Sequence, residues 1–481
     1  MANLLLVTSN GTGMGHLTRQ AAVALSLGDT HTATLFSLSP GLPLATGLGI
    51  PGEYCPSYDR PWIATRNWNS YLRDRLVAIA EEMSADAILF DGVAPYPGIA
   101  HAATALRHVA FIWLRRGMWK NTNDRALGKG AFFDLVIEPG DLASAHDIGP
   151  TAALEAQRIR PISILEPLGL LPRDEARRRL GLPLDRPVAL VTLGSGRLGD
   201  VVGPGRVAVE TLLAKTSDWQ VAVTRSPVAL NEIPVEQAER ITTLSGIYPL
   251  ATFFSAFDIA VSSAGYNAVH ELIPAGVPSL MVANTSTRTD DQVARALSLE
   301  RQNLALATTD VDLEAVAEKL ASLISDQTRD ALSENAGATM EAITGATEAG
   351  VSAAAFAATF DHRRMTLAQS ARRGVERVKE GVRNVLGDER TESLKKAMGR
   401  QASPVHQRAT VRVVDGMGGA GGDPTELAFV RTVTSADLRL DQPIEHVLSG
   451  ASSNYQERRR ELVARYYDVS NGSERRDSPP L

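Results

Sequence analysis

The sequence predicts an α/β protein of two similar domains followed by a C-terminal extension. The chain has 481 residues, too many for one ordinary hydrophobic core. Short apolar runs alternate with longer helical segments over 1–162 and again over 173–345, which is typical of parallel sheets covered by helices on both faces. Residues 163–172, in a proline-rich stretch between them, are interpreted as an interdomain linker.

The first domain is expected to begin with a strand at Leu4–Thr8, a glycine-rich turn and a helix from about Leu17 to Leu27. A further helix is predicted around Gly98–Leu106. The remaining buried strands are predicted at Thr32–Ser37, Ala87–Phe90, Val109–Leu114 and Leu135–Ile137.

The second domain is predicted to open with the charged helix Arg173–Leu180, which ends at Gly181 and Pro183. Its strands are expected at Val188–Leu193, Trp219–Thr224, Ile241–Leu244, Ile259–Ser262 and Ser279–Val282. The repeated strand–turn–helix order predicts a second parallel sheet.

The C-terminal part has a different character. Residues 346–400 are predicted to form a helix that crosses back and then a basic helix, and 401–481 a partly disordered extension. Over 361–400 there are 11 Lys and Arg against 6 Asp and Glu. Such a helix can dock on an anionic lipid surface or can simply be solvated, and both interpretations stay open.

Composition excludes several functional classes. A net charge of −6 and a pI near 5.9 argue against nucleic-acid binding. The single cysteine, Cys55, excludes an internal disulfide and a cysteine-based zinc site, and no histidine pair has metal-binding spacing. Without a signal peptide or a run of 18 apolar residues, we expect a cytoplasmic protein, with peripheral membrane contact through 361–400 as an open alternative.

A glycine-rich turn, Asn10–His16, joins the first strand to the first helix. Backbone N–H groups of Gly13, Met14 and Gly15 meet the positive end of that helix, which suits an anion. Burial and the helix dipole would keep His16 neutral, as a general base requires, although a histidine that only packs or caps is the alternative. The second strand ends in neutral residues where a nicotinamide dinucleotide would need an acid, so a dehydrogenase is disfavoured.

Further polar residues follow strands of the first domain. Asp91 lies at the carboxyl end of a strand, where α/β sheets collect their ligands, and is a second candidate base or a partner of His16; an Asp-Gly turn residue is the plain alternative. Arg115 and Arg116 are candidates for an acceptor phosphate, against the alternative of a solvated pair.

The second domain carries a denser constellation. Its strand Ile259–Ser262 runs into a small-residue turn and a helix start, which suits a diphosphate; the residues concerned are Ser263, Ala264, Gly265, Tyr266 and Asn267. Glu271 lies roughly 9 Å further along that helix, a suitable offset for ribose hydroxyls. Asp291 and Gln292 together offer acceptors and donors to hexose hydroxyls. Arg225, at the end of a strand, is a candidate phosphate ligand.

The runs GIYP (246–249), SSAGYNAVHE (262–271), GVP (276–278) and DDQ (290–292) resemble the donor half of GT-B glycosyltransferases, most closely the MurG-like group, family 28. The turn at 11–16 resembles that group's N-terminal loop. The resemblance implies two Rossmann-like domains facing across a cleft, and it gives roles to residues already described. Glu271 becomes the ribose ligand, Gly265 and its neighbours the diphosphate cradle, and Asp291 with Gln292 the sugar contacts.

The same resemblance implies that the backbone of Ile247 contacts the uracil and that Gly194, Ser195 and Gly196 face the diphosphate. It places His16 near the acceptor. The chain departs from the family pattern at Ala268, where a hydroxyl residue is common, and in its long tail.

These interpretations lead to a UDP-sugar-dependent hexosyltransferase. An acceptor hydroxyl, deprotonated by His16 or Asp91, would displace UDP with inversion, and no metal or other cofactor is expected. The expected partners are a nucleotide-sugar donor and an acceptor whose identity the sequence leaves open, with a lipid-linked or a glycan acceptor as the candidates. Two alternatives remain: a UDP-N-acetylglucosamine 2-epimerase-like enzyme, which needs no acceptor, and a non-catalytic nucleotide-sugar-binding protein.

Overall fold

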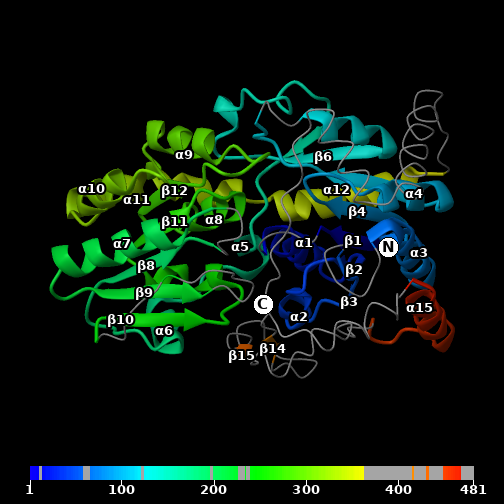
Figure 1. The fold of residues 1–481 in the computed structure, drawn as a ribbon, viewed down its shortest axis with the longest axis horizontal. Helices are drawn as coiled ribbons and strands as arrows, with labels where there is room; N and C mark the ends of the chain where they lie inside the picture. The colour runs from blue at the N-terminus through cyan, green and yellow to red at the C-terminus, as the bar shows by residue number, and fades with distance from the viewer. Residues whose placement is uncertain are drawn as a thin grey trace.

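The computed structural model confirms the two predicted α/β domains (Figure 1). It describes residues 1–9, 14–57, 65–120, 124–194, 199–225, 233, 239–361, 414–416, 430–432 and 448–466. The first domain has a 7-stranded sheet in the order β3-β2-β1-β4-β5-β6-β7, and the second a 6-stranded sheet in the order β10-β9-β8-β11-β12-β13. Neighbouring strands run parallel throughout these two sheets.

The strands of the first sheet are β1 (Asn3–Thr8), β2 (Thr32–Ser37), β3 (Gly52–Tyr54), β4 (Ala87–Asp91), β5 (Ala110–Leu114), β6 (Leu135–Pro139) and β7 (Gln157–Ile159). The helical segments between them are α1 (Gly15–Ser26), α2 (Leu42–Thr46), α3 (Thr65–Glu82), α4 (Pro97–Ala105), η1 (Asp124–Phe132) and η2 (Ser144–His146). All residues of β4 and β5 are buried, because helices cover both faces of the sheet. The short strands β3 and β7 were not predicted. Each has only three residues and no apolar run, and two of the three residues of β7 are exposed.

The strands of the second sheet are β8 (Val188–Thr192), β9 (Gln220–Arg225), β10 (Ile241–Ser245), β11 (Ile259–Ser263), β12 (Ser279–Ala283) and β13 (Leu306–Thr309). Its helical segments are α5 (Leu165–Leu168), α6 (Arg173–Leu180), α7 (Val202–Lys215), η3 (Leu250–Ala256), α8 (Tyr266–Leu272), α9 (Gln292–Arg301), α10 (Leu313–Leu323), α11 (Asp326–Ala336) and η4 (Gly337–Ala342).

The order of strands reverses at one point in each sheet. These points lie between β1 and β4 in the first domain and between β8 and β11 in the second. In open parallel sheets the carboxyl ends of strands at such a reversal form a crevice that binds ligands. The chain therefore brings the start of α1 and the end of β4 together in one domain, and the ends of β8 and β11 together in the other.

Helix α12 (Gly345–Thr359) returns from the second domain to the first, where it packs against α1 and the sheet. Its contact face is made of small residues, among them the fully buried Ala346, Ala349 and Ala353. Gly350 fits there because a Cβ at this position would lie 2.7 Å from a side-chain carbon of Leu27. The carboxylate of Glu166 accepts hydrogen bonds from the first backbone N–H groups of α12, which fixes where the helix begins.

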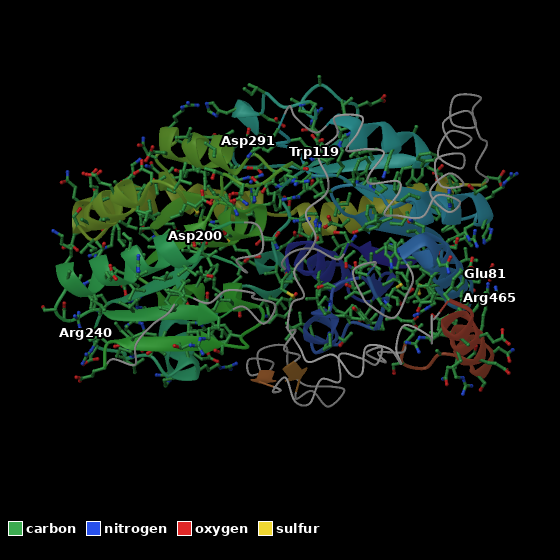
Figure 2. The ribbon with its side chains drawn as sticks, in the orientation of Figure 1. Glu81, Trp119, Asp200, Arg240, Asp291 and Arg465 are labelled. Atoms are coloured by element: carbon green, nitrogen blue, oxygen red, sulfur yellow. The ribbon has the colours of Figure 1, made fainter. Side chains whose placement is uncertain are left out.

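Helix α15 (Ser453–Tyr466) lies beside α3, as Figure 2 shows by the neighbouring labels of Glu81 and Arg465. Tyr455 and Leu462 of α15 belong to the same hydrophobic cluster as the core around α3. The Tyr455 hydroxyl donates a 2.7 Å hydrogen bond to the buried carboxylate of Glu53, which also pairs with Arg75. The first domain is thus completed by a helix from the C-terminal region, which the sequence did not predict.

The other predictions for the C-terminal region remain untested. Residues 362–400, including nearly all of the basic stretch, lie outside the described residues, and so do most of 401–447 and all of 467–481. The exceptions are the short strands β14 (Val414–Gly416) and β15 (Val430–Thr432), which pair antiparallel. Among the described helices, none combines the length and apolarity needed to cross a bilayer.

We predict that Tyr455→Phe lowers the free energy of unfolding by about 1–3 kcal/mol, because a buried carboxylate would lose a hydrogen-bond donor. Chemical denaturation monitored on the first domain measures the change. Tyr466→Phe is the matched control, since its hydroxyl donates to Asp74 at a partly exposed position and should cost less. Equal effects from the two substitutions would contradict the docking of α15 on Glu53.

Candidate functional site

Two adjoining pockets lie between the domains, at the reversal points of the two sheets. The Glu271 pocket is lined by Glu271, Arg225 and Ile247, among others, and the Gln292 pocket by Gln292 and His16, among others. The residues that line both pockets are Gly15, Gly194, Ser263, Asn267 and Ala268. The shared lining makes the two pockets one continuous cleft.

On the first-domain side, His16 in the first turn of α1 contacts Asp91 at the end of β4. His16 Nδ1 lies 2.7 Å from Asp91 Oδ1. Arg19, one turn further along α1, donates from Nε and Nη2 to the two oxygens of Asp91 at 2.9 and 2.8 Å. His16 Nδ1 also lies 2.8 Å from Arg19 Nη2, which can only donate and which already donates to Asp91 Oδ1. We assign the ring proton to Nδ1 as a donor to the carboxylate, the strongest acceptor within reach, and this tautomer leaves Nε2 free to accept a proton.

The electrostatics of this group give the two acid–base candidates different roles. Asp91 is buried, and its Arg19 and His16 partners outweigh the desolvation and lower the pKa of the carboxyl to about 2. Burial lowers the pKa of His16 below its ordinary value. Because both Asp91 oxygens are already engaged, the geometry favours His16 as the base and Asp91 as the residue that positions it.

Arg19 also links this group to the second domain. Its Nη1 donates to Asn267 Oδ1 at 2.9 Å, and Asn267 Nδ2 donates to the Gly15 carbonyl at 3.3 Å. Asn267 lies at the start of α8, so the first turns of α1 and α8 face one another across the cleft. Arg19 was not predicted as a site residue; its spacing of three from His16, which places both on one helix face, was the available signal.

The donor half of the predicted site assembles around α8. Gly265 precedes the first residue of this helix, and Glu271 lies in its last turn, on the same cleft wall as Ile247. Burial raises the pKa of Glu271 to about 8. Gly194 follows β8 and has φ +87°, a conformation that favours glycine, while Ser195 and Gly196 lie outside the described residues. Met14 lines the Glu271 pocket, and Gly13 is not described.

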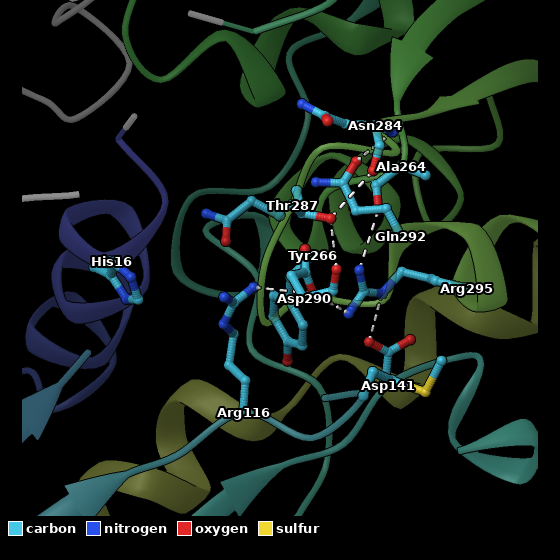
Figure 3. A network of polar contacts seen from close by, with 12 residues as sticks. His16, Arg116, Asp141, Ala264, Tyr266, Asn284, Thr287, Asp290, Gln292 and Arg295 are labelled. Carbon is cyan, nitrogen blue, oxygen red and sulfur yellow. Dashed lines mark hydrogen bonds and ion pairs between the residues drawn. The ribbon is translucent and has the colours of Figure 1, made fainter. Parts of the chain in front are cut away.

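The acidic side chain that reaches the cleft beside Gln292 is that of Asp290, whereas the predicted Asp291 faces away from it. The Asp291 side chain caps α9 by accepting from the Ala294 N–H at 3.1 Å, and it is absent from the described lining of either pocket. Asp290 lines the Gln292 pocket and accepts from Arg295 Nη2 at 2.9 Å (Figure 3). Because Asp290 and Asp291 are adjacent, the sequence alone does not indicate which of the two side chains faces the cleft.

Gln292 does lie in the cleft. Its Oε1 accepts from the Asn284 N–H at 3.1 Å, so the orientation of the amide is fixed and its NH₂ group can donate to a ligand (Figure 3). Asn284, on the loop after β12, lines the same pocket and was not predicted.

Three other predicted residues have structural partners. Arg115 is buried and donates to Glu138 at 2.7 Å, so it does not serve as the predicted acceptor-side cation; only Arg116 reaches the cleft. Ala264 is buried, and its carbonyl accepts from Arg295. Tyr266 lines the Gln292 pocket, but its hydroxyl joins the domains, donating to the Gly140 carbonyl and accepting from the Ile162 N–H.

A short backbone pairing also joins the domains beside the site. Trp119 forms an antiparallel bridge with Asp290, and the labels of Trp119 and Asp291 lie together in Figure 2. Lys120 donates from its side chain to the carbonyls of Thr285 and Thr287. This contact holds the loop before α9, and with it Asp290 and Gln292, against the first domain.

The sequence of the second domain matches a known family. Residues 221–350 match the glycosyltransferase family 28 C-terminal domain. Over this stretch the second domain is similar to family 28 glycosyltransferases. This match contains Arg225, Ile247, Glu271 and Gln292, all of which line the cleft.

Two relatives share the name UDP-N-acetylglucosamine--N-acetylmuramyl-(pentapeptide) pyrophosphoryl-undecaprenol N-acetylglucosamine transferase. The protein from Acetivibrio thermocellus is 27% identical over 165 residues, which are 33% of this chain and 44% of that protein. The protein from Salinibacter ruber is 30% identical over 145 residues, 30% of this chain and 39% of that protein. The chain therefore spans less than half the length of the curated relatives it matches.

Solved structures confirm the GT-B fold. The glycosyltransferase SnogD from Streptomyces nogalater aligns with a TM-score of 0.51 at 16% identity, covering 74% of this chain and 99% of that one. A candidate UDP-N-acetylglucosamine 2-epimerase from Listeria monocytogenes aligns with a TM-score of 0.51 at 13% identity, covering 72% and 94%. Since transferases and an epimerase candidate share this fold, the fold alone does not choose between those activities.

We predict that Glu271→Gln removes a pH dependence of stability between about pH 5 and pH 8. The folded pKa of Glu271 is raised above its unfolded value, so folding binds a proton in this range and the free energy of unfolding falls as pH rises. Denaturation curves of the wild type and the variant at several pH values measure the difference, which should grow in favour of the variant with rising pH.

Glu348→Gln is the control with the opposite sign. The pKa of Glu348 is lowered by its Arg160 and Thr344 contacts, so its contribution to stability is present above the unfolded pKa and lost in acid. This variant should leave the slope between pH 5 and pH 8 unchanged. Identical slopes for the wild type and Glu271→Gln would contradict the assignment.

Proposed function

We propose that the protein is a glycosyltransferase that moves a hexose from a UDP-sugar to an acceptor hydroxyl. One observation carries the proposal: a histidine oriented by a buried carboxylate lies across one cleft from residues of the stretch that matches the family 28 C-terminal domain. An epimerase needs no acceptor base on the opposite domain. A non-catalytic binding protein needs no oriented base at all.

In this proposal the nucleoside lies in the Glu271 pocket, with ribose hydroxyls donating to Glu271 and the base beside Ile247. The diphosphate lies at the start of α8, where free N–H groups and the helix dipole favour negative charge. The hexose extends into the Gln292 pocket toward His16.

The proposed reaction is a direct displacement. His16 Nε2 takes the proton of the acceptor hydroxyl, the oxygen attacks the anomeric carbon, and UDP leaves with inversion. Charge that develops on the leaving diphosphate is stabilised by the start of α8. The expectation that no metal is needed stays a prediction.

The acceptor is a second part of the proposal. The names of the two relatives above give them an acceptor on pyrophosphoryl-undecaprenol. A lipid-linked acceptor is therefore the first that we propose to test for this chain.

We predict that UDP raises the melting temperature of the protein and that Glu271→Ala abolishes most of the shift, because only the folded state presents the ribose contact. A thermal-shift screen with UDP, UDP-N-acetylglucosamine, UDP-glucose, GDP-mannose and NAD measures this. Glu348→Ala, far from the pockets, is the control and should keep the shift. An unchanged melting temperature at millimolar concentrations of every nucleotide would contradict the proposed donor site.

We predict that Asp91→Asn lowers the rate of acceptor-dependent UDP release by roughly 10²–10⁴-fold, because an amide donates to Nδ1 and shifts the His16 proton to Nε2. The wild-type rate should rise with pH as His16 loses its proton. Because the pKa of His16 is lowered from 6.5, the midpoint of this rise should lie below pH 6.5.

A retained UDP-induced thermal shift shows that Asp91→Asn is folded, and the exposed Asp29→Asn is the matched control. Product analysis distinguishes the alternatives: conversion of the sugar without any acceptor would mark an epimerase. Full transfer activity in both Asp91→Asn and His16→Gln would exclude the proposed base.

A further inference from the structure

Arg116 is a guanidinium in the Gln292 pocket that makes no hydrogen bond to the described residues. It is the second residue after β5, and its side chain is 15% exposed. Its one polar contact within the described part of the chain is an ion pair with Asp290, at 3.7 Å between Nη1 and Oδ1. At that distance the N–H groups of Arg116 remain available to a ligand.

The carboxylates around Arg116 are already engaged by other arginines. Arg295 donates to Asp290 at 2.9 Å and to Asp141 at 2.7 Å, and it is fully buried. On the other side, Arg19 binds both oxygens of Asp91. Three guanidinium groups therefore lie close together. Arg19 binds both oxygens of one carboxylate, Arg295 binds two carboxylates, and Arg116 has only the longer contact with Asp290.

The position of Arg116 relates it to the reacting atoms. In Figure 3 its guanidinium lies between His16 and Asp290, below Gln292. The base candidate and the sugar end of the donor site are thus on either side of it. The nucleoside end of the cleft is remote, since Arg116 does not line the Glu271 pocket.

We propose that Arg116 binds an acidic group of the substrate, a carboxylate or phosphate next to the anomeric centre, so that the enzyme selects an anionic sugar or acceptor. This inference rests on the proposed function. A planar guanidinium with free N–H groups binds the two oxygens of a carboxylate or phosphate in parallel. A neutral hexose hydroxyl would use only one of them.

The surroundings favour an anion over a neutral group. Burial and the neighbouring charges of Arg19 and Arg295 lower the pKa of Arg116, and Asp290 only partly offsets them. An anionic oxygen placed between these guanidinium groups would relieve that repulsion, whereas a hydroxyl would not.

Two sources can supply the acidic group, and the test separates them. In the donor arm, calorimetry measures the binding of UDP, UDP-glucose and UDP-glucuronate. UDP-glucuronate carries a carboxylate where UDP-glucose carries a hydroxymethyl group. In the acceptor arm, inorganic phosphate is titrated into protein saturated with UDP. Each arm uses the wild type, Arg116→Gln, Arg116→Lys and the control Arg301→Gln, an exposed arginine at the end of α9.

If the donor carries the acid, UDP-glucuronate binds the wild type at least tenfold more tightly than UDP-glucose, and Arg116→Gln abolishes the preference. If the acceptor carries the acidic group, inorganic phosphate binds the UDP complex of the wild type, and Arg116→Gln lowers the affinity for phosphate at least tenfold. Arg116→Lys should recover part of either effect, because it restores the charge without the planar fork. UDP alone should bind all four proteins alike.

Two results would overturn the inference. In one, neither the sugar preference nor phosphate binding depends on Arg116. In the other, Arg116→Gln weakens UDP itself as much as the UDP-sugars, which would make Arg116 a ligand of the leaving diphosphate. Absence of UDP binding by the wild type is a different result, because it contradicts the proposed function and not the role of Arg116 alone.

Discussion

The ion pair between Arg19 and Asp91 is the interaction on which the rest of the site depends. It joins α1 to the end of β4 at the reversal point of the first sheet, and both partners are buried. Such a pair is costly to bury, and it is tolerated because Asp91 is hydrogen-bonded at both oxygens. The pair orients His16, and through Asn267 it sets the distance between the first turns of α1 and α8. Removing either charge would disturb both halves of the cleft.

A second constraint is that the cleft is built from two separate sheets that must face each other correctly. The Trp119 bridge, the Lys120 contacts and the Tyr266 hydroxyl bind backbone groups of the opposite domain. Backbone groups are fixed by the fold, so these contacts define one closed arrangement more sharply than side-chain pairs would. Opening the cleft to exchange ligands has to break them together. If the proposed reaction takes place, domain separation is therefore expected to be its slow step.

Much of this arrangement could be predicted from the sequence. Continuous apolar runs indicated most of the strands, and the small residues after β11, Glu271 and Gln292, which were predicted to lie together, line one cleft. Contacts between distant segments could not be predicted in this way. Arg115 and Arg116 are adjacent in sequence, yet one is buried against Glu138 and the other reaches the cleft, because successive residues after a strand point in opposite directions. Similarly, Asp290 and Asp291 differ only in which of them caps α9.

The helix α15 has a consequence for the order in which the protein is made. The first domain includes β1 near the N-terminus, but it also needs α12 and α15 for its core, and these follow the whole second domain in the chain. Domains generally fold as the ribosome releases them, from the N-terminus onward. The sheet of each domain comes from one continuous stretch of chain, but only the first domain takes helices from beyond the other domain. The second domain can therefore fold while the first domain still lacks α12 and α15, and the buried pair of Glu53 and Arg75 lacks its Tyr455 contact until α15 has been made.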